Sequence, residues 1–234
     1  MSPLKRLKRI HNFYRDMAAF KKAGGVITDI YPILSDYGNQ AGTATGHYFH
    51  QDLLVATLIK QANPTRHIDV GSSIEGFVAH VASYREIEVL DIRPLQIPGH
   101  SQIRFVQSDL MKLDQSSIAI CDSLSCLHAL EHFGLGRYGD SIDPNGHLKG
   151  FYNLSKMLQS GGTLYVSFPI GKPGVHFNAH RIFHPKDILD WSKNLFQLIR
   201  FDYVDDDGNL HPNASLTPLP ILTYGCGIYT LRKK

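Results

Sequence analysis

The segment from His67 to Gly76 constrains the fold more strongly than any other part of the sequence. It reads His-Ile-Asp-Val-Gly-Ser-Ser-Ile-Glu-Gly, a short apolar run that ends in a glycine loop and leads into a helical pattern. Gly71 allows the chain to turn sharply after a strand, and Gly76 allows the following helix to approach that strand closely. Backbone N–H groups at the start of such a helix face a bound ligand. The segment therefore predicts a strand, loop and helix unit with a ligand site at the loop.

Short apolar runs and helical patterns alternate along the rest of the chain. The expected strands are residues 67–70, 87–91, 103–107, 117–123 and 163–168, and the expected helices are residues 76–84, 148–158 and 185–195. The last two strands, 197–204 and 222–231, are joined by a polar loop instead of a helix, which indicates an antiparallel hairpin at the sheet edge. The sequence predicts an α/β fold, a Rossmann-like, seven-stranded, mostly parallel sheet with helices on both faces.

Residues 1–46 are expected to form an N-terminal helical extension, and residues 47–234 a single α/β domain. Apolar residues recur at helical spacing over residues 4–22 and again over residues 50–62. The formal net charge of +3 comes partly from two short basic ends, which are usually solvated tails, so we expect no nucleic acid partner. The sequence has no run of 18 apolar residues and its three cysteines form no paired motif, so we expect a cytoplasmic protein without membrane insertion.

Two carboxylates follow the glycine loop at the ends of the next two strands. Asp91, 20 residues beyond Gly71, can accept hydrogen bonds from both hydroxyls of a ribose. Asp109 can accept from an adenine amino group, while Ile92 and Leu110 flank the ring. The ordinary alternative is that each aspartate only ends a strand, as many loop aspartates do. Their joint order favours a nucleoside site.

The loop itself departs from the dinucleotide pattern. Ser73 stands where the middle glycine of GxGxxG belongs, so a dinucleotide is disfavoured. Asp69 lies inside the first strand, where it is better placed to hold the N–H groups of the loop than to touch a ligand. The candidate cofactor-binding residues are Asp69, Gly71, Ser72, Ser73, Gly76, Asp91, Ile92, Asp109 and Leu110.

These residues resemble the first three motifs of class I methyltransferases that depend on S-adenosylmethionine (SAM), and the likeness covers about residues 47–234. The motifs are Asp69-Val-Gly71, Glu88-Val-Leu-Asp91 and Ser108-Asp109. Two further stretches, His47–Asp52 and His128–Asp140, resemble an uncharacterised methyltransferase-like family catalogued as domain of unknown function 268. The resemblance implies SAM as cofactor and, because genes of that family often lie near surface-polysaccharide genes, a small or sugar-like acceptor such as a polysaccharide precursor.

A group of histidines follows the predicted fourth strand. His128, Glu131 and His132 have the spacing i, i+3 and i+4, so on a helix they share one face at the ligand-binding edge of the sheet. Methyl transfer to oxygen needs a group that removes the acceptor proton, and a neutral histidine suits that role. His132 and His128 are the first candidates for this catalytic base and His180 the second.

The same three residues allow other interpretations. Some ubiquinone-pathway O-methyltransferases carry a similar stretch that binds a metal, so His128, Glu131 and His132 are candidate ligands of a divalent metal. His-x-x-Glu-His is also the inverted zinc-protease motif, which would make the chain a metal-dependent hydrolase, although that motif does not normally follow a buried strand. A polar helix start that only satisfies local backbone groups is the simplest interpretation.

Three features near the ligand-binding edge of the sheet each allow two interpretations. Tyr48 could cover the methionine end of SAM or pack as part of a helix lying on the sheet. Residues 169–181 could be a substrate loop or a connector. Arg137 and Tyr138 could position an acceptor or form a surface turn. A SAM-binding or nucleotide-binding protein of this fold without methyl transfer is the main alternative function.

Overall fold

The computed structural model describes residues 3–96, 99–218 and 221–234, which fall into two compact units. The first unit extends to Thr43 and contains helix α1 (Pro3–Lys22), which has no buried residue. Arg9 on this helix donates hydrogen bonds to the carbonyl oxygens of Leu34, Ser35 and Tyr37, which tie the following irregular segment to it. This unit lies within the extension predicted over residues 1–46, whose boundary stays a prediction.

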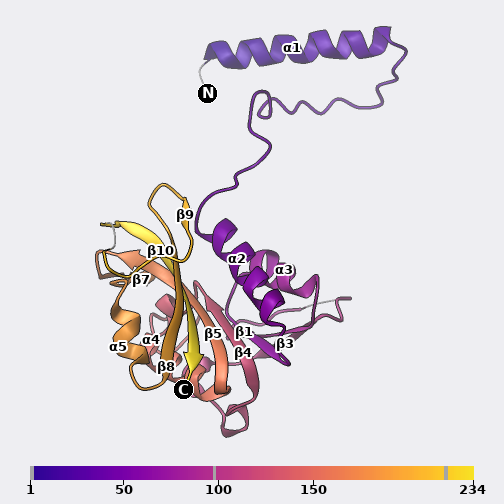
Figure 1. Ribbon diagram of the computed structural model, residues 1–234. Coiled ribbons are helices and arrows are strands. Elements are labelled where there is room, and N and C mark those ends of the chain that lie inside the picture. Colours follow the sequence, from indigo (N-terminus) through magenta and orange to yellow (C-terminus); the bar gives the residue numbers. More distant parts are fainter. Residues whose placement is uncertain (1–2, 97–98, 219–220) are drawn as a thin grey trace. The chain divides into compact units, whose positions relative to one another are not determined.

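The second unit, Ala44–Lys234, contains the sheet, which has eight strands in the order β3-β2-β1-β4-β5-β10-β8-β9 (Figure 1). The strands are β1 (His67–Val70), β2 (Ile87–Asp91), β3 (Ile103–Gln107), β4 (Cys121–Leu127), β5 (Leu158–Gly171), β8 (Phe196–Val204), β9 (Leu210–His211) and β10 (Tyr224–Lys233). Strands β1 to β5 are parallel, and β10 runs antiparallel between β5 and β8. The predicted α/β class and mostly parallel sheet are confirmed. The predicted count of seven strands is one too low, because the short β9 adds to β8 at the edge.

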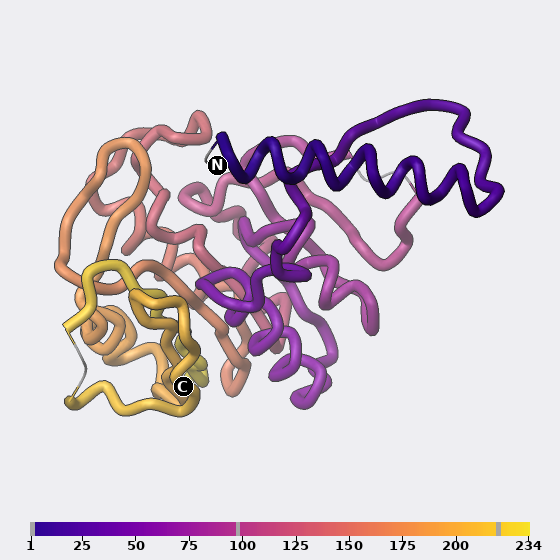
Figure 2. Tube along the Cα trace, turned by 90° about the horizontal axis from the view of Figure 1, so that it is seen from above, coloured from indigo at the N-terminus to yellow at the C-terminus, as the bar shows by residue number. Residues whose placement is uncertain are grey.

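Helices cover both faces of this sheet, as Figures 1 and 2 show. Residues Val55 and Ile59 of α2 (His47–Ala62) pack with Phe77 and Val81 on one face, where α3 (Ala79–Ala82) also lies. On the other face, α4 (Gly146–Met157) and α5 (Asp187–Ser192) bury their apolar residues in a second core. Burial of this apolar surface is the main term that stabilises the sheet. Its faces are thus closed, and only its edges and strand ends can hold a ligand.

Several boundaries differ from the sequence prediction. The fourth strand was expected at 117–123 but lies at Cys121–Leu127, because Asp114 caps a 3₁₀ turn (η3, Gln115–Ser117) by accepting from the Ser116 N–H. The helix expected at 76–84 is a π-helical turn (η1, Ile74–Val78) followed by α3. These shifts matter for function, since β4 now ends directly before His128.

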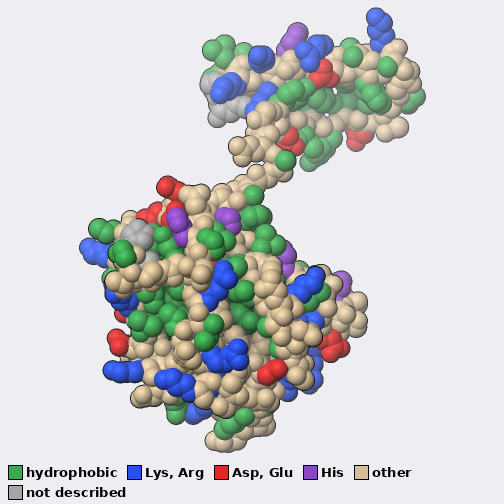
Figure 3. Space-filling model, viewed as in Figure 1, with side chains coloured by type: hydrophobic (Ala, Val, Ile, Leu, Met, Phe, Trp, Pro, Cys, Tyr) green, Lys and Arg blue, Asp and Glu red, His purple; other side chains and the backbone are tan. Residues whose placement is uncertain are grey.

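The helices and the charged side chains of the surface bear on contact with a membrane. No helix among the described residues is long and apolar enough to cross a membrane. Lys and Arg side chains are scattered over the face of the second unit seen in Figure 3 and do not gather in one patch.

Candidate functional site

A cavity opens at the carboxyl ends of β1 to β4, where the strand order changes direction between β1 and β4. This position is where ligands bind in open α/β sheets. Five of the predicted cofactor-binding residues line it, namely Gly71, Asp91, Ile92, Asp109 and Leu110. The remaining lining residues are Val70, Leu90, Arg93, Ser108, Met111, His128, Ala129, His132, Phe133, Tyr138 and Asp140.

A buried polar network centred on Asp69 holds the glycine loop in place. Asp69 accepts hydrogen bonds from the Ser72 N–H (3.1 Å), the Ser72 hydroxyl (2.6 Å) and the Ser125 hydroxyl (2.5 Å). The Ser72 hydroxyl in turn accepts from the N–H of Leu127 on β4 (3.1 Å). Burial raises the pKa of Asp69 to about 6, although these hydrogen bonds act in the opposite direction. Asp69 therefore positions the loop and does not reach the cavity.

Gly71 makes the turn after β1 with a φ of 69°, and a Cβ there would lie 3.0 Å from that of Ala129. Ser72 and Ser73 do not line the cavity itself; they line an adjoining groove together with Asp91 and Arg93. The loop thus contributes Gly71 to the cavity and Ser73 to the groove, while the hydroxyl of Ser72 points to buried Asp69.

Gly76, predicted as a cofactor-binding residue, lies next to α2 in the structure. This residue lines neither the cavity nor the groove, and a Cβ on it would collide with the carboxylate of Asp52 on α2. Burial raises the pKa of Asp52 to about 6. Gly76 therefore makes room for a buried carboxylate from another helix, a long-range contact that no local pattern indicates.

Asp91 has a partner that the sequence analysis did not predict. Its carboxylate accepts two hydrogen bonds from the Arg93 guanidinium (3.0 and 2.6 Å) and one from the Arg93 N–H (2.8 Å). The same guanidinium lies 4.5 Å from the ring centre of Tyr138. The cavity volume is about 60 Å³, room for only a few water molecules, so side chains that line it, such as Arg93, must move before an adenosyl group can enter.

Asp109 lies at the mouth of the cavity. Its carboxylate caps the 3₁₀ turn η2 (Leu110–Lys112) by accepting from the Met111 N–H at 3.0 Å. The carbonyl oxygen of Leu110 accepts from the amide of Asn153 on α4 at 2.8 Å, which fixes this turn against the core. Ile92 and Leu110 therefore face a common cavity with a carboxylate beside them.

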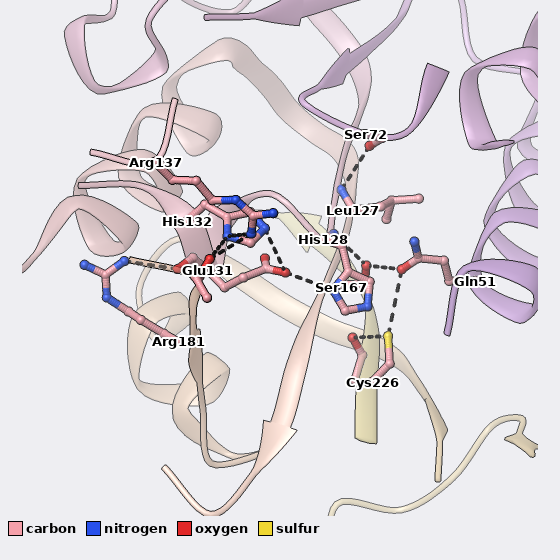
Figure 4. A network of polar contacts seen from close by, with 12 residues as sticks. Gln51, Ser72, Leu127, His128, Glu131, His132, Arg137, Ser167, Arg181 and Cys226 are labelled. Atoms are coloured by element: carbon pink, nitrogen blue, oxygen red, sulfur yellow. Dashed lines mark hydrogen bonds and ion pairs between the residues drawn. The ribbon is translucent and has the colours of Figure 1, made fainter. Parts of the chain in front are cut away.

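His128, Glu131 and His132 do not share a helix face, which corrects the sequence prediction. His128 directly follows β4 with a φ of 50°, and the other two lie in a 3₁₀ turn (η4, Leu130–His132), because β4 continues to Leu127. The three side chains still meet (Figure 4): Glu131 Oε1 lies 2.8 Å from His128 Nδ1 and 3.7 Å from His132 Nε2. The helical geometry of an inverted zinc-protease motif is absent from this described segment.

The two histidines differ in protonation. Burial lowers the pKa of His128, but the nearby Cys226 and Glu131 outweigh it and raise that pKa well above its usual value. For His132, burial prevails over the effect of Glu131 and lowers the pKa. His132 Nδ1 lies 2.6 Å from the carbonyl oxygen of Ala179, which can only accept, so Nδ1 carries the hydrogen and Nε2 the lone pair. His132 is the better placed base.

An aromatic cluster extends from His128 away from the cavity. His47 stacks on His128 with ring centres 5.3 Å apart, and Tyr48 lies 5.1 Å from the same ring. Tyr224 lies 5.4 Å from His47 and 5.3 Å from His180. Burial lowers the pKa of His47 to about 4 and also lowers that of His180. Tyr48 thus packs on a histidine beside the cavity.

The segment after β4 is anchored by one buried arginine. Arg181, 4% exposed, donates to the carbonyl oxygens of Glu131, Phe133, Asp143 and Pro144 at 2.6–3.3 Å. It lies on β7 (His180–Ile182), which pairs with β6 (Gly174–His176), so residues 169–181 include an ordered hairpin. Within the anchored segment, Asp140 accepts from the N–H groups of Gly134, Gly136 and Tyr138. Sequence reasoning missed Arg181, because all its partners are backbone carbonyls.

Comparison with protein families gives one match. Residues 82–189 match the model of the family described as "Caenorhabditis protein of unknown function, DUF268". The resemblance to this family is confirmed. The matched stretch includes Asp91, Asp109 and the histidines after β4. No curated protein matches the sequence at a significant level.

Solved structures with a similar fold include methyltransferases and a cyclase. The N-methyltransferase NodS from Bradyrhizobium japonicum, in complex with S-adenosylhomocysteine, has a TM-score of 0.55 and 11% identity over 80% of this chain and 88% of its own. The 1,6-didemethyltoxoflavin-N1-methyltransferase from Burkholderia thailandensis, also with bound S-adenosylhomocysteine, has a TM-score of 0.53. Its sequence identity is 16%, and the match covers 100% of this chain and 91% of that chain. The [4+2]-cyclase SpnF has a TM-score of 0.58 and 14% sequence identity, and the match covers 98% of this chain and 96% of that chain. These likenesses establish the fold.

Replacing Arg181 tests how the segment after β4 is held. Arg181→Met leaves four carbonyl oxygens without their charged donor, and we expect the free energy of unfolding to fall by about 2–4 kcal/mol in urea denaturation. The exposed Arg232, which donates to the Gly161 carbonyl oxygen, is the matched control, and Arg232→Met should change stability by less than about 0.5 kcal/mol. Equal losses in the two variants would contradict the anchoring role of Arg181.

Proposed function

We propose that this chain is a SAM-dependent methyltransferase whose cofactor occupies the cavity at the ends of β1 to β4. The observation that carries the proposal is that Gly71, Asp91 and Asp109, which follow three different strands, line one cavity together with Ile92 and Leu110. The fold of the neighbours agrees with this assignment. Because one of them is a cyclase, the fold alone does not assign methyl transfer.

In the proposed complex, each part of SAM has a defined neighbour in the cavity. Ile92 and Leu110 hold the adenine ring between them, and the Asp109 carboxylate accepts from the adenine amino group. Asp91 accepts from the two ribose hydroxyls once Arg93 has moved away. The methionine part then lies toward the backbone of Gly71.

The chemistry requires an acceptor that is aligned and deprotonated. Bound SAM supplies an electrophilic methyl group. His132 Nε2 takes the proton of the acceptor hydroxyl, and the buried carboxylate of Glu131, 3.7 Å away, stabilises the imidazolium that forms. Among the three predicted catalytic histidines, His132 is preferred over His128 because its pKa is lowered and not raised, and over His180 because His180 does not line the cavity. The acceptor proposed for this site is a small or sugar-like molecule that carries a hydroxyl group.

The main alternative is a protein that binds SAM or a nucleotide without methyl transfer. The similar fold of the [4+2]-cyclase SpnF favours this alternative, since it shows that this fold is not tied to methyl transfer. Turnover of labelled SAM with hydroxylated acceptors separates the two functions, because a silent binder gives saturable binding without methylated product.

The role of Asp91 can be tested by calorimetric titration with S-adenosylhomocysteine. Asp91→Ala removes a charged acceptor of two ribose hydrogen bonds, so we expect the affinity to fall by about 10–100-fold. Asp114→Ala is the control, because Asp114 only caps the exposed turn η3 and does not line the cavity. Unchanged affinity of Asp91→Ala would refute the proposed cofactor site.

A substitution of Arg93 is expected to change the affinity for S-adenosylhomocysteine in the opposite direction. Arg93→Met removes a partly exposed ion pair that ligand binding must otherwise break, and such pairs contribute about 0–1 kcal/mol. The affinity for S-adenosylhomocysteine should therefore rise by up to about 5-fold in the same titration. Weaker binding by this variant would mean that Arg93 contacts the ligand and does not compete with it.

The base can be tested once an acceptor hydroxyl compound is found by turnover of labelled SAM. His132→Ala should lower kcat by about 10²–10⁴-fold, because general base catalysis contributes that much, while S-adenosylhomocysteine affinity stays within a few-fold. His50→Ala, on α2 and outside the cavity lining, is the control. Equal kcat for His132→Ala and the control would assign the proton to another group.

A further inference from the structure

Three metal-ligating side chains from distant parts of the sequence converge beside the candidate cofactor cavity. They are His47 at the start of α2, His128 after β4 and Cys226 on β10, and one nitrogen or sulfur atom of each lies within 4.8 Å of the others. Among the described residues this is the group that meets such a criterion, whereas the predicted triad of His128, Glu131 and His132 does not. The sequence prediction of that triad as metal ligands is therefore not supported.

The arrangement around His128 allows its Nε2 atom to bind a metal ion. Its Nδ1 is occupied by Glu131 Oε1 at 2.8 Å, and Nε2 is buried with no hydrogen-bond partner in the part of the chain that the structure describes. A histidine that binds a metal through one nitrogen usually donates its other N–H to a carboxylate or carbonyl, which fixes the ring orientation. Glu131, 1% exposed, supplies such a carboxylate.

Cys226 makes only long polar contacts to oxygen atoms, and it lies close enough to His128 to raise the pKa of that ring. Its side chain is fully buried and in no disulfide, and Sγ lies 3.8 Å from Gln51 Oε1 and 3.8 Å from the carbonyl oxygen of Gly227. Gln51 Oε1 already accepts a much shorter hydrogen bond, 2.5 Å, from the Ser167 hydroxyl (Figure 4). The thiol therefore keeps its lone pairs available next to two imidazoles.

The third ligand, His47, is held in place while remaining accessible. Its ring is nearly parallel to that of His128, at 6°, and Tyr224 stacks on it at 5.4 Å. His47 is only partly buried, so the cluster borders on solvent at this residue.

We propose that His47, His128 and Cys226 bind one Zn²⁺ ion. Two imidazoles and a thiolate are a donor set that Zn²⁺ prefers, and three protein ligands leave the fourth tetrahedral position open. Zn–N and Zn–S bonds of about 2.0–2.3 Å place ligand atoms roughly 3.3–3.7 Å apart, so the cluster closes by about 1 Å on binding. Binding releases the thiol proton of Cys226 and, because the pKa of His128 is raised, also the Nε2 proton of His128, so that Nε2 binds the ion through its lone pair. The site stands whether or not the chain transfers methyl groups.

Metal titration of the full chain tests this site. After removal of metal with a chelator, Zn²⁺ titrated in competition with a chromophoric chelator should bind with a stoichiometry of one. Co²⁺ in its place should give visible bands of tetrahedral cobalt and a near-ultraviolet charge-transfer band from thiolate to metal. Cys226→Ser should abolish the charge-transfer band and weaken Zn²⁺ binding by at least about 10-fold.

Matched variants separate a metal effect from a folding effect. Cys121→Ser changes another buried thiol, which donates weakly to the Met157 carbonyl oxygen, and should leave metal binding unchanged. His47→Ala should weaken Zn²⁺ binding, whereas His50→Ala one helical turn away should not. His47 is partly exposed, so this comparison remains available if Cys226→Ser fails to fold. Substoichiometric Zn²⁺, a cobalt spectrum without the thiolate band, or equal affinities of His47→Ala and His50→Ala would each overturn the proposal.

Discussion

The candidate site depends on how one buried cation holds the segment after β4. Arg181 has no carboxylate within hydrogen-bonding distance among its described partners, and four carbonyl oxygens compensate its charge. Burial lowers its pKa, which reflects the cost of placing a guanidinium there. That cost is offset because the five N–H donors of an arginine can satisfy several carbonyl groups at once. One of the carbonyls lies in η4, one directly follows it and two precede α4, so the interaction fixes both ends of the segment that carries His132 and Tyr138.

A second buried polar group fixes the opposite wall of the same cavity. Asp69 binds Ser72 in the loop after β1 and Ser125 on β4, so the glycine loop is attached to the strand that ends at His128. The two walls therefore share β4 as their common support. Rigid support of this kind is what precise placement of a ligand requires. By contrast, Arg93 lies on the rim, is half exposed and can move without disturbing either network.

The sequence predicted those features that local patterns encode. Strand β2 and its terminal Asp91, strand β3 and the following Asp109, and the turn at Gly71 all lie where the spacing placed them. The start of β4 was four residues off, because a strand buried on both faces has no alternation that fixes its ends. Contacts between distant segments could not be predicted from the sequence, because they depend on topology and leave no local pattern. Examples are Asp52 against Gly76, Arg181 with its four carbonyl oxygens, and Cys226 beside His128.

His128 belongs to both candidate sites, so a change of charge at one site affects the other. Its Nε2 faces the cluster with His47 and Cys226, and its Nδ1 contacts Glu131, which also lies 3.7 Å from His132 Nε2. Because Glu131 is nearly fully buried, its charge is poorly screened and acts on both rings. A cation or proton on His128 draws on that charge and leaves less of it to stabilise an imidazolium at His132. The basicity of His132 therefore depends on what His128 binds, because both rings approach the same oxygen of Glu131.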